Sequence, residues 1–224
     1  MTAKNGAIVW VDLEMTGLDV EKDAIVEVAV VVTDSELNAL DDGIDLVVAP
    51  PAEALAQMSE TVRTMHTTSG LLEELPGGLP LDEASKRVMT YIRRHVPQVR
   101  RAPLAGNSVG TDRAFLERYM PAITDHLHYR VIDVSSIKEL ARRWYPRAYF
   151  AAPEKNGGHR ALADILESID ELRYYRAVLF PDGDGPDSVT ARALAEEIKA
   201  SPTGAAQAQD DGVRSSDGGG EPSR

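Results

Sequence analysis

The sequence predicts an α/β domain, a mixed β-sheet with antiparallel opening strands that is flanked by helices. Three runs rich in β-branched residues follow one another near the N-terminus, over residues 7–17, 24–33 and 44–48, which favours an antiparallel meander. From about residue 51 the pattern changes, because helical stretches then alternate with short strands. Strands that come first, followed by alternating helices and strands, are typical of a mixed sheet covered by helices.

The first strand ends in two acids. Residues 8–11 are Ile, Val, Trp and Val, a run apolar enough for a strand buried on both faces. Asp12 and Glu14 lie two residues apart, so their side chains leave one face of the strand, with Cα atoms about 6.5–7 Å apart. Carboxylates this close repel each other and are costly to desolvate, and a hard divalent cation such as Mg²⁺ would relieve both penalties. The alternative is a frayed strand end whose acids simply reach solvent.

The second strand is predicted to be buried and contains one lone acid, Glu27. The elements after it are predicted from the spacing of apolar residues and from turn residues. Residues 147–158 are rich in Pro, Gly and Ala and predict a loop. Ser136 and Glu139 fit a capping box in the helix that ends near Tyr145. In chain order we expect a helix over 58–70, a helix over 82–96, a short strand over 103–106, a helix over 110–119, a short strand over 131–133, the helix ending near 145 and a long helix over 160–180.

The composition predicts one folded domain with an extension. Residues 1–180 form the domain, 181–200 a linker and a short amphipathic helix, and 201–224, dominated by Ser, Gly, Ala, Gln and Asp, a disordered tail. No apolar run approaches the ~18 residues of a membrane span, and the N-terminus lacks the apolar core of a signal peptide. The chain has no Cys, which excludes disulfides and zinc–thiolate sites. We therefore expect a cytoplasmic protein without a membrane partner.

The charge limits the kind of nucleic acid that the chain could bind. Its formal net charge is −12; nine acids and four Lys or Arg residues lie in 181–224, which leaves −7 for 1–180. An acidic body argues against tracking a long phosphate backbone, because such binding depends on many Lys and Arg contacts. Three Phe, two Trp and seven Tyr leave little material for an extended stacking platform. A nucleic-acid substrate should therefore be short.

Three more polar residues fall at element junctions, where a site could be assembled. Asp112 and Asp164 each stand in the first turn of a predicted helix, where the alternative is an acid that the helix dipole favours by about 0.3–1 kcal/mol. His159 directly precedes the last long helix, behind Gly157 and Gly158. The positive end of the helix dipole disfavours the imidazolium and would keep His159 neutral near pH 7, as a general base requires. Its alternative is an ordinary surface histidine.

Together the five residues match one pattern: D-x-E in an early strand, D near the middle, and H-x4-D at the last long helix. The chain resembles the DEDD exonuclease superfamily, also called DnaQ-like or RNase H-like, in its His-containing branch. Within it the chain is similar to the oligoribonuclease family from about residue 6 to 180. The segments that carry the similarity are WVDLEMTGLD (10–19), MHTTSGL (65–71), LAGNSVGTDRAFL (104–116), YRVIDVSSIKELARRW (129–144) and HRALADILESIDELRYY (159–175).

The resemblance implies a 3′→5′ exoribonuclease that hydrolyses single-stranded RNA of two to five nucleotides, dinucleotides especially, to 5′-nucleoside monophosphates. It implies two divalent ions, Mg²⁺ or Mn²⁺, in an RNase H-like domain. Asp12 would bridge both ions, Glu14 and Asp164 would hold the ion that carries the attacking water, and Asp112 would serve the other ion. His159 would take the proton from that water, and we expect it to swing in only when substrate and metals are bound.

The resemblance also implies a pocket that closes the 5′ side of the substrate. Ser108, Arg130, Ser135 and Ser136 would surround the terminal 5′-phosphate, with His66 and Asn107 nearby. Leu18 would wedge between bases, and Tyr129 would stack on them from the neighbouring subunit of a homodimer. One Arg with hydroxyls and helix N-terminal N–H groups makes a compact phosphate site.

Plainer roles stay open for several of these residues. Ser135 and Ser136 could be N-caps, Leu18 a turn residue and Tyr129 a surface residue. Thr61 stands where some family members carry Trp, so an aromatic contact from that position is missing.

Two other functions stay open. A DNA-proofreading or tRNA-trimming exonuclease of the same superfamily would need a partner-binding tail or a basic groove, and the sequence shows neither. A non-catalytic RNA-binding module would most simply show a broken set of acids, whereas all four acids and His159 are present.

Overall fold

The computed structural model describes residues 6–154, 158–181 and 183–200. Contacts divide the chain into two units, Met1–Phe180 and Pro181–Arg224, and each is described by itself. The predicted disordered tail, residues 201–224, and Gly157, one of the two glycines before His159, lie outside the described residues.

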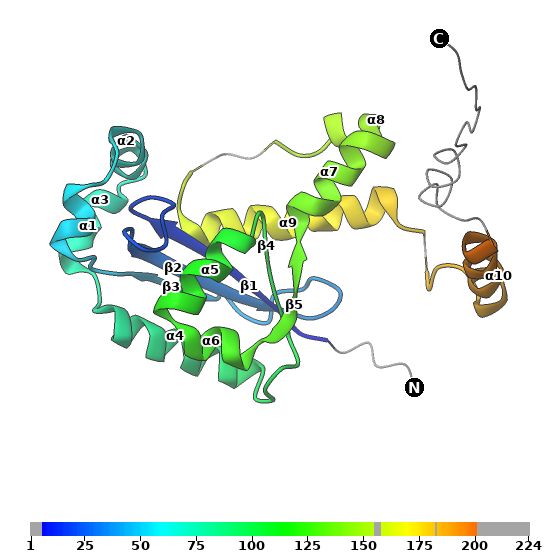
Figure 1. Ribbon diagram of the computed structural model, residues 1–224, viewed down its shortest axis with the longest axis horizontal. Helices are drawn as coiled ribbons and strands as arrows, with labels where there is room; N and C mark the ends of the chain where they lie inside the picture. Colours follow the sequence, from blue (N-terminus) through cyan, green and yellow to red (C-terminus); the bar gives the residue numbers. More distant parts are fainter. Residues whose placement is uncertain (1–5, 155–157, 182, 201–224) are drawn as a thin grey trace, which may run out of the picture. The chain divides into compact units, whose positions relative to one another are not determined.

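A five-stranded mixed sheet lies at the centre of the first unit (Figure 1), in the order β3-β2-β1-β4-β5. Strands β1, β2 and β3 form an antiparallel meander, and β4 and β5 run parallel to β1. The structure therefore confirms the predicted mixed sheet and its antiparallel opening. The strands are β1 (Ile8–Met15), β2 (Ile25–Thr33), β3 (Ile44–Val47), β4 (Pro103–Gly106) and β5 (His128–Asp133).

Helices cover both faces of the sheet, because the apolar side chains of β1 alternate between the two faces and need cover on each. Val9, Val11 and Leu13 pack against one helical layer, and Ile8 and Trp10 pack against the other. The first layer consists of α4 (Leu81–His95), α5 (Gly110–Tyr119) and α6 (Pro121–His126). The second includes α7 (Val134–Trp144) and α9 (Ala161–Leu179), which in Figure 1 crosses the sheet on the side away from α4. Asp12 and Glu14 follow Trp10 at two-residue steps along β1, so their side chains lie on the same face of the sheet as Trp10 and face α9.

Short helices fill the connection from β3 to α4. Only one of them was predicted, the helix over 58–70, which is observed as α2 and begins after its N-cap Ser59. The others are too short for an apolar period to be visible in the sequence. The set comprises α1 (Ala52–Ala56), α2 (Glu60–Thr68), α3 (Leu71–Glu74) and the 3₁₀ helix η1 (Leu75–Gly77).

Three local predictions need correction. The capping box is wrong, because Asp133 caps α7 by accepting the Ser135 N–H at 2.9 Å, which places Ser136 inside the helix. The predicted loop 147–158 begins with a helical turn, α8 (Pro146–Phe150), which starts with a proline at its first position. Strand β5 starts at His128, three residues before the predicted start at residue 131. The prediction missed these three residues because they are polar and follow no apolar pattern.

The second unit contains α10 (Ser188–Ala200), as predicted. Asp187 Oδ1 accepts the N–H groups of Val189 and Thr190, both at 2.8 Å, which satisfies donors of its first turn. None of its residues is buried. Across the described residues of both units, no helix combines the length and the apolar composition that a membrane crossing requires.

Candidate active site

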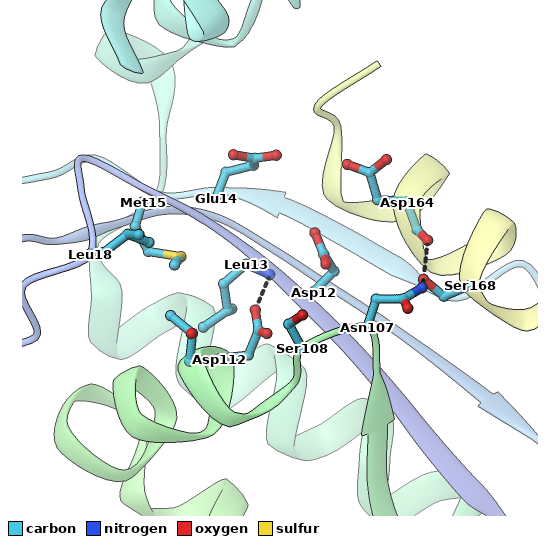
Figure 2. Close-up of a pocket in the computed structure, with 11 residues that line it drawn as sticks. Asp12, Leu13, Glu14, Met15, Leu18, Asn107, Ser108, Asp112, Asp164 and Ser168 are labelled. Atoms are coloured by element: carbon cyan, nitrogen blue, oxygen red, sulfur yellow. Dashed lines mark hydrogen bonds between the residues drawn. The ribbon is translucent and has the colours of Figure 1, made fainter. Parts of the chain in front are cut away.

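A cavity of about 300 Å³ lies beside the end of β1, and all four predicted acids line it (Figure 2). Asp12 and Glu14 come from β1, Asp112 from α5 and Asp164 from α9. The parallel strands β1, β4 and β5 direct their carboxyl ends to this region, which is where open α/β sheets bind their ligands. The structure therefore brings together four carboxylates that span about 150 residues of sequence.

Asp112 reaches β1 because β4 stops short. Strand β4 pairs with β1 only at Val9 and Trp10, so the β1 backbone beyond them has no strand partner on that side. Asp112 Oδ1 accepts the Leu13 N–H there, at 3.0 Å. This one hydrogen bond satisfies the buried N–H of Leu13, which lies between Asp12 and Glu14 in sequence. The same bond fixes the carboxylate of Asp112, a predicted metal ligand.

Asp164 is fixed through its backbone. Its N–H donates to the Arg160 carbonyl at 3.0 Å, and its carbonyl accepts the Ser168 hydroxyl at 2.7 Å. Asn107, from the end of β4, donates to Ser168 Oγ at 2.8 Å and to Glu171 Oε2 at 3.1 Å. These bonds tie the first turns of α9 to the carboxyl end of β4.

Burial raises the pKa of Asp12, Glu14 and Asp112, and neighbouring carboxylates of the site add to the rise for the first two. Burial, assisted by the charges of Asp112, Asp164 and Glu14, raises the pKa of Asp12 to about 9. Burial and the charge of Asp164 likewise raise the pKa of Glu14 to about 8. Burial raises the pKa of Asp112 to about 6 although its bond to the Leu13 N–H acts in the opposite direction. Ionising all of them together is therefore costly unless a cation compensates.

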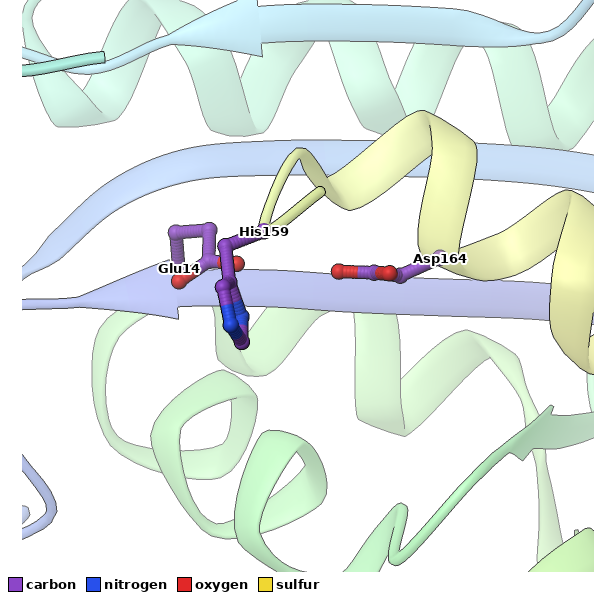
Figure 3. A group of neighbouring side chains, drawn as sticks. All are labelled: Glu14, His159 and Asp164. Carbon is purple, nitrogen blue, oxygen red and sulfur yellow. The ribbon is translucent and has the colours of Figure 1, made fainter. Parts of the chain in front are cut away.

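The donor set fits hard divalent cations. Oxygen atoms of buried carboxylates are the ligands that Mg²⁺ and Mn²⁺ prefer. Ligand atoms of Glu14, His159 and Asp164 all lie within 4.8 Å of one another (Figure 3). His159 thus lies beside Glu14 and Asp164, although it is exposed and is not among the described residues that line the cavity. Its backbone is left-handed, with φ +47°. The expectation that His159 swings in only with substrate and metals stays a prediction.

The hydroxyls of Ser108 and Ser135 lie side by side at the rim of this region. Ser108 Oγ and Ser135 Oγ are 3.1 Å apart. The Ser108 backbone is left-handed, with φ +52°, a conformation that costs a non-glycine residue about 1–3 kcal/mol. Asp133 and Ser135 hold it there, because the Ser108 N–H donates to Asp133 Oδ1 and to Ser135 Oγ, both at 3.0 Å. Ser108 and Asn107 line the cavity, and Asn107 Oδ1 accepts the Ser135 hydroxyl at 3.0 Å.

Two further predicted residues occupy different environments. Leu18 lines the cavity and is 78% exposed, which suits a residue that meets a ligand. His66 is fully buried: its Nε2 lies 2.9 Å from the Met15 carbonyl oxygen and its Nδ1 lies 3.9 Å from Glu14 Oε2. His66 therefore stands behind Glu14 and is not among the described residues that line the cavity.

Tyr129, Arg130 and Ser136 are exposed and do not line the cavity within the described part of this chain. Arg130 Nε donates to the Tyr129 hydroxyl at 3.1 Å, and the Arg130 guanidinium carbon lies 5.5 Å from the centre of the Tyr129 ring. Tyr129 is 68% exposed. Tyr129 and Arg130 of β5 thus contact each other, and Ser136 lies in the first turn of α7.

Sequence reasoning missed several residues that complete the site. Thr111 lines the cavity beside Asp112, and no pattern marks it. Ser168 and Glu171 were detectable, because they follow Asp164 at i+4 and i+7 and so place polar groups on the apolar face of α9. Glu27, the lone acid of the second strand, accepts the first N–H of α9 at 3.0 Å. The sequence marks this acid as unusual but does not indicate that its partner is α9.

The chain is similar to exonucleases in sequence and in fold. Residues 9–172 match the RNase_T family model, described as an exonuclease. An oligoribonuclease of Streptomyces coelicolor is 62% identical over 191 residues, covering 85% of this chain and 96% of that protein. An oligoribonuclease of Leifsonia xyli subsp. xyli is 57% identical over 198 residues, covering 88% and 96%.

Solved structures of exonuclease I share the fold. Exonuclease I of E. coli in complex with a dA16 oligonucleotide matches with a TM-score of 0.61 at 14% identity, over 78% of this chain and 41% of that chain. Exonuclease I of Methylocaldum szegediense matches with a TM-score of 0.57 at 19% identity, again covering 78% and 41%. The chain thus spans about two fifths of these structures, and at such identities the likeness concerns the fold alone.

Proposed function

The chain belongs to the oligoribonuclease family of exonucleases, and from this premise we propose how its cavity cleaves RNA. It is a metal-dependent 3′→5′ exoribonuclease that acts on short oligoribonucleotides. The observation that carries the mechanism is the convergence of Asp12, Glu14, Asp112 and Asp164 on one cavity, with the pKa raised for the first three.

Asp12, Glu14, Asp112 and Asp164 would together hold two Mg²⁺ or Mn²⁺ ions. When bound, such a pair would supply stabilisation of the attacking and leaving oxygens of an in-line displacement at phosphorus. The buried oxygen donors and their mutual repulsion support this proposal.

His159 acts as the general base. Its imidazole lies beside Glu14 and Asp164 and takes the proton of the attacking water. The new P–O bond forms as the bond to the 3′ oxygen of the preceding nucleotide breaks, and a 5′-nucleoside monophosphate leaves. The leaving 3′ oxygen gains a proton from solvent, so the preceding nucleotide ends in a 3′ hydroxyl.

The 5′-phosphate pocket explains a preference for very short RNA. We propose that Ser108 and Ser135, with Ser136 and the first N–H groups of α7, bind the terminal 5′-phosphate, and that Arg130 supplies the positive charge. The support is the 3.1 Å pairing of the Ser108 and Ser135 hydroxyls and the left-handed Ser108 backbone. Asn107 supports the pocket through its bond to the Ser135 hydroxyl, and exposed Leu18 wedges between the bases. His66 stands behind Glu14 and supports that side of the site.

A homodimer would complete the pocket. Tyr129 and Val131 of β5 and Trp144 of α7 are 68%, 40% and 66% exposed, and a second copy would bury such exposed apolar side chains. In such a dimer Tyr129 would stack on the bases in the partner's site. A cytoplasmic location, expected from the sequence, stays a prediction.

The test is turnover of 5′-phosphorylated RNAs of two to seven nucleotides with Mg²⁺, with Mn²⁺ and with EDTA. We expect the dinucleotide to be cleaved fastest and EDTA to abolish cleavage. Equal rates at all lengths would contradict the 5′-phosphate pocket and leave a broader exonuclease of the same superfamily. Turnover that persists in EDTA would contradict the metal mechanism.

A further inference from the structure

Glu27 is a fully buried carboxylate that the chemistry above does not use. It is 0% exposed and lies opposite Glu14 in the β1–β2 register. Burying a carboxylate is costly unless its oxygens are paired and hydrogen-bonded. Both oxygens of Glu27 find donors at the start of α9: Oε1 accepts Arg160 Nε at 2.8 Å and Oε2 accepts the Ala161 N–H at 3.0 Å.

Glu27 replaces the missing N-cap of α9. The residue at the cap position is Arg160, whose side chain makes no capping hydrogen bond. Glu27 supplies the acceptor from the neighbouring strand, and its negative charge suits the positive end of the helix dipole. The position of the first turn of α9 is therefore determined by a residue of β2.

Arg160 continues this connection to a third element. Its Nη1 and Nη2 donate to Oε1 and Oε2 of Glu74, at the end of α3, at 2.8 and 3.2 Å. A guanidinium held through three nitrogens by two carboxylates has little freedom to reorient. We call Glu27, Arg160 and Glu74 the α9 clamp.

His159 is the residue next to the clamped Arg160. Its left-handed backbone turns the chain immediately before α9, and its imidazole lies between Glu14 and Asp164 in the view of Figure 3, with ligand atoms of the three residues within 4.8 Å of one another. Its side chain is exposed, so little packing holds the imidazole in place. The next residue, Arg160, is held through its guanidinium by Glu27 and Glu74.

We propose that the α9 clamp positions His159: Arg160, held by Glu27 and Glu74, fixes the backbone from which the imidazole reaches the attacking water. Glu27, Arg160 and Glu74 are positioning residues, because they act on the reaction only through the backbone of His159, whose imidazole lies beside Glu14 and Asp164. A misplacement of about 1 Å of a catalytic group can cost about 10²-fold in rate. The inference rests on the proposed role of His159 as the general base.

The test is a double-mutant cycle between the clamp and His159. Arg160→Lys keeps the positive charge beside Glu27 but loses the planar fork that joins two carboxylates. Arg176→Lys is the matched control, since Arg176 lies near the other end of α9 and pairs with Glu36 at 2.6 Å, both side chains being 48% exposed. Each substitution is made in the natural chain and in His159→Ala, and kcat and KM are measured with a 5′-phosphorylated dinucleotide at saturating Mg²⁺.

We expect Arg160→Lys to lower kcat by about tenfold or more in the natural chain while KM changes by less than about twofold. In His159→Ala the same substitution should change the rate by less than about twofold, because no imidazole is left to position. Arg176→Lys should stay within about twofold in both backgrounds. Equal losses from Arg160→Lys in both backgrounds would overturn the proposal, because a purely structural role is additive with His159→Ala.

The single variants separate this inference from the proposed function. His159→Ala alone should cost about 10²–10⁴ in rate, and a near-normal rate would remove the general base and the clamp's role together. A full loss in His159→Ala with no coupling to Arg160 would remove the clamp alone. If Arg160→Lys does not fold, Glu74→Gln enters the same cycle, since it removes only the 46%-exposed outer carboxylate. Absence of coupling for Glu74→Gln would then overturn the proposal.

Discussion

Asp12 is the residue on which the site depends most strongly. It lies among the carboxylates of Glu14, Asp112 and Asp164, and its pKa of about 9 is higher than the pKa of Glu14, about 8, and that of Asp112, about 6. Near neutral pH the metal-free protein therefore holds a proton on Asp12 that the unfolded chain would release. Bound cations would favour the ionised form of Asp12 instead. The carboxylate that destabilises the metal-free protein would therefore stabilise the metal-bound protein.

Asp12→Asn should abolish turnover and stabilise the metal-free protein. Because the folded pKa lies above the unfolded one, stability contributed by the protonated form is lost as the pH rises from about 4 to about 9. In EDTA at pH 8, Asp12→Asn should raise the melting temperature by at least about 2–4 °C, the shift that about 1 kcal/mol gives at this chain length. Thermal unfolding from pH 5 to pH 9 measures it, with exposed Asp125→Asn as the control. A difference that does not grow with pH would contradict the pKa assignment.

At the scale of elements, the site is made by a few chain termini and turns. The end of β1, the residues that follow β4 and the first turns of α5 and α9 meet around one cavity. The turn after β1 carries Leu18 to its mouth. This turn is fastened from α5, because the Tyr119 hydroxyl lies 3.0 Å from the Val20 carbonyl oxygen and 2.8 Å from that of Asp23.

Tyr119→Phe should therefore loosen the Leu18 turn. We expect KM for a dinucleotide to rise about threefold to tenfold with little change in kcat, because the loss of about 1 kcal/mol of hydrogen bonding falls on substrate binding. Tyr174→Phe is the matched control, since the Tyr174 hydroxyl donates to the Ala148 carbonyl at 2.7 Å away from the cavity. A KM that changes equally in both variants would argue against a role for the turn in binding.

The elements that could be predicted are those with a repeating apolar pattern. Strands β1 and β2 and helices α4 and α9 are long enough for that pattern to identify them, and the five catalytic candidates could be recognised from their order and spacing. Helix α8 was missed because it is a single turn without an apolar period. The Asp133 cap was missed because Ser136 and Glu139 offered a competing match three residues later.

Contacts between distant segments could not be read from the sequence. Glu27 and Arg160 are separated by 133 positions, and neither carries a local signal that names the other. A polar residue in an apolar strand shows only that it needs a partner, whereas the fold decides which one it receives. The supporting residues of the site therefore emerge only when the strands and α9 are brought together.

At the scale of the whole molecule, a second copy would add Tyr129 to the site. Mixed dimers of a Tyr129→Ala chain and an Asp12→Ala chain test this. If Tyr129 acts across the interface, the intact acids of the first chain receive Tyr129 from the second, and about half of the natural activity should return. If Tyr129 acts within its own chain, no complete site exists and the mixture should be no more active than its components.

The central claim is that the four carboxylates converge because they hold divalent cations. Calorimetric titration of Mn²⁺ into the metal-free protein at pH 7, in two buffers with different ionisation enthalpies, tests it most directly. With a pKa of about 9 on Asp12 and about 8 on Glu14, binding should release on the order of one to two protons per chain, and Asp12→Asn should remove most of the affinity. Absence of binding, or equal heats in both buffers with unchanged affinity in Asp12→Asn, would contradict the account.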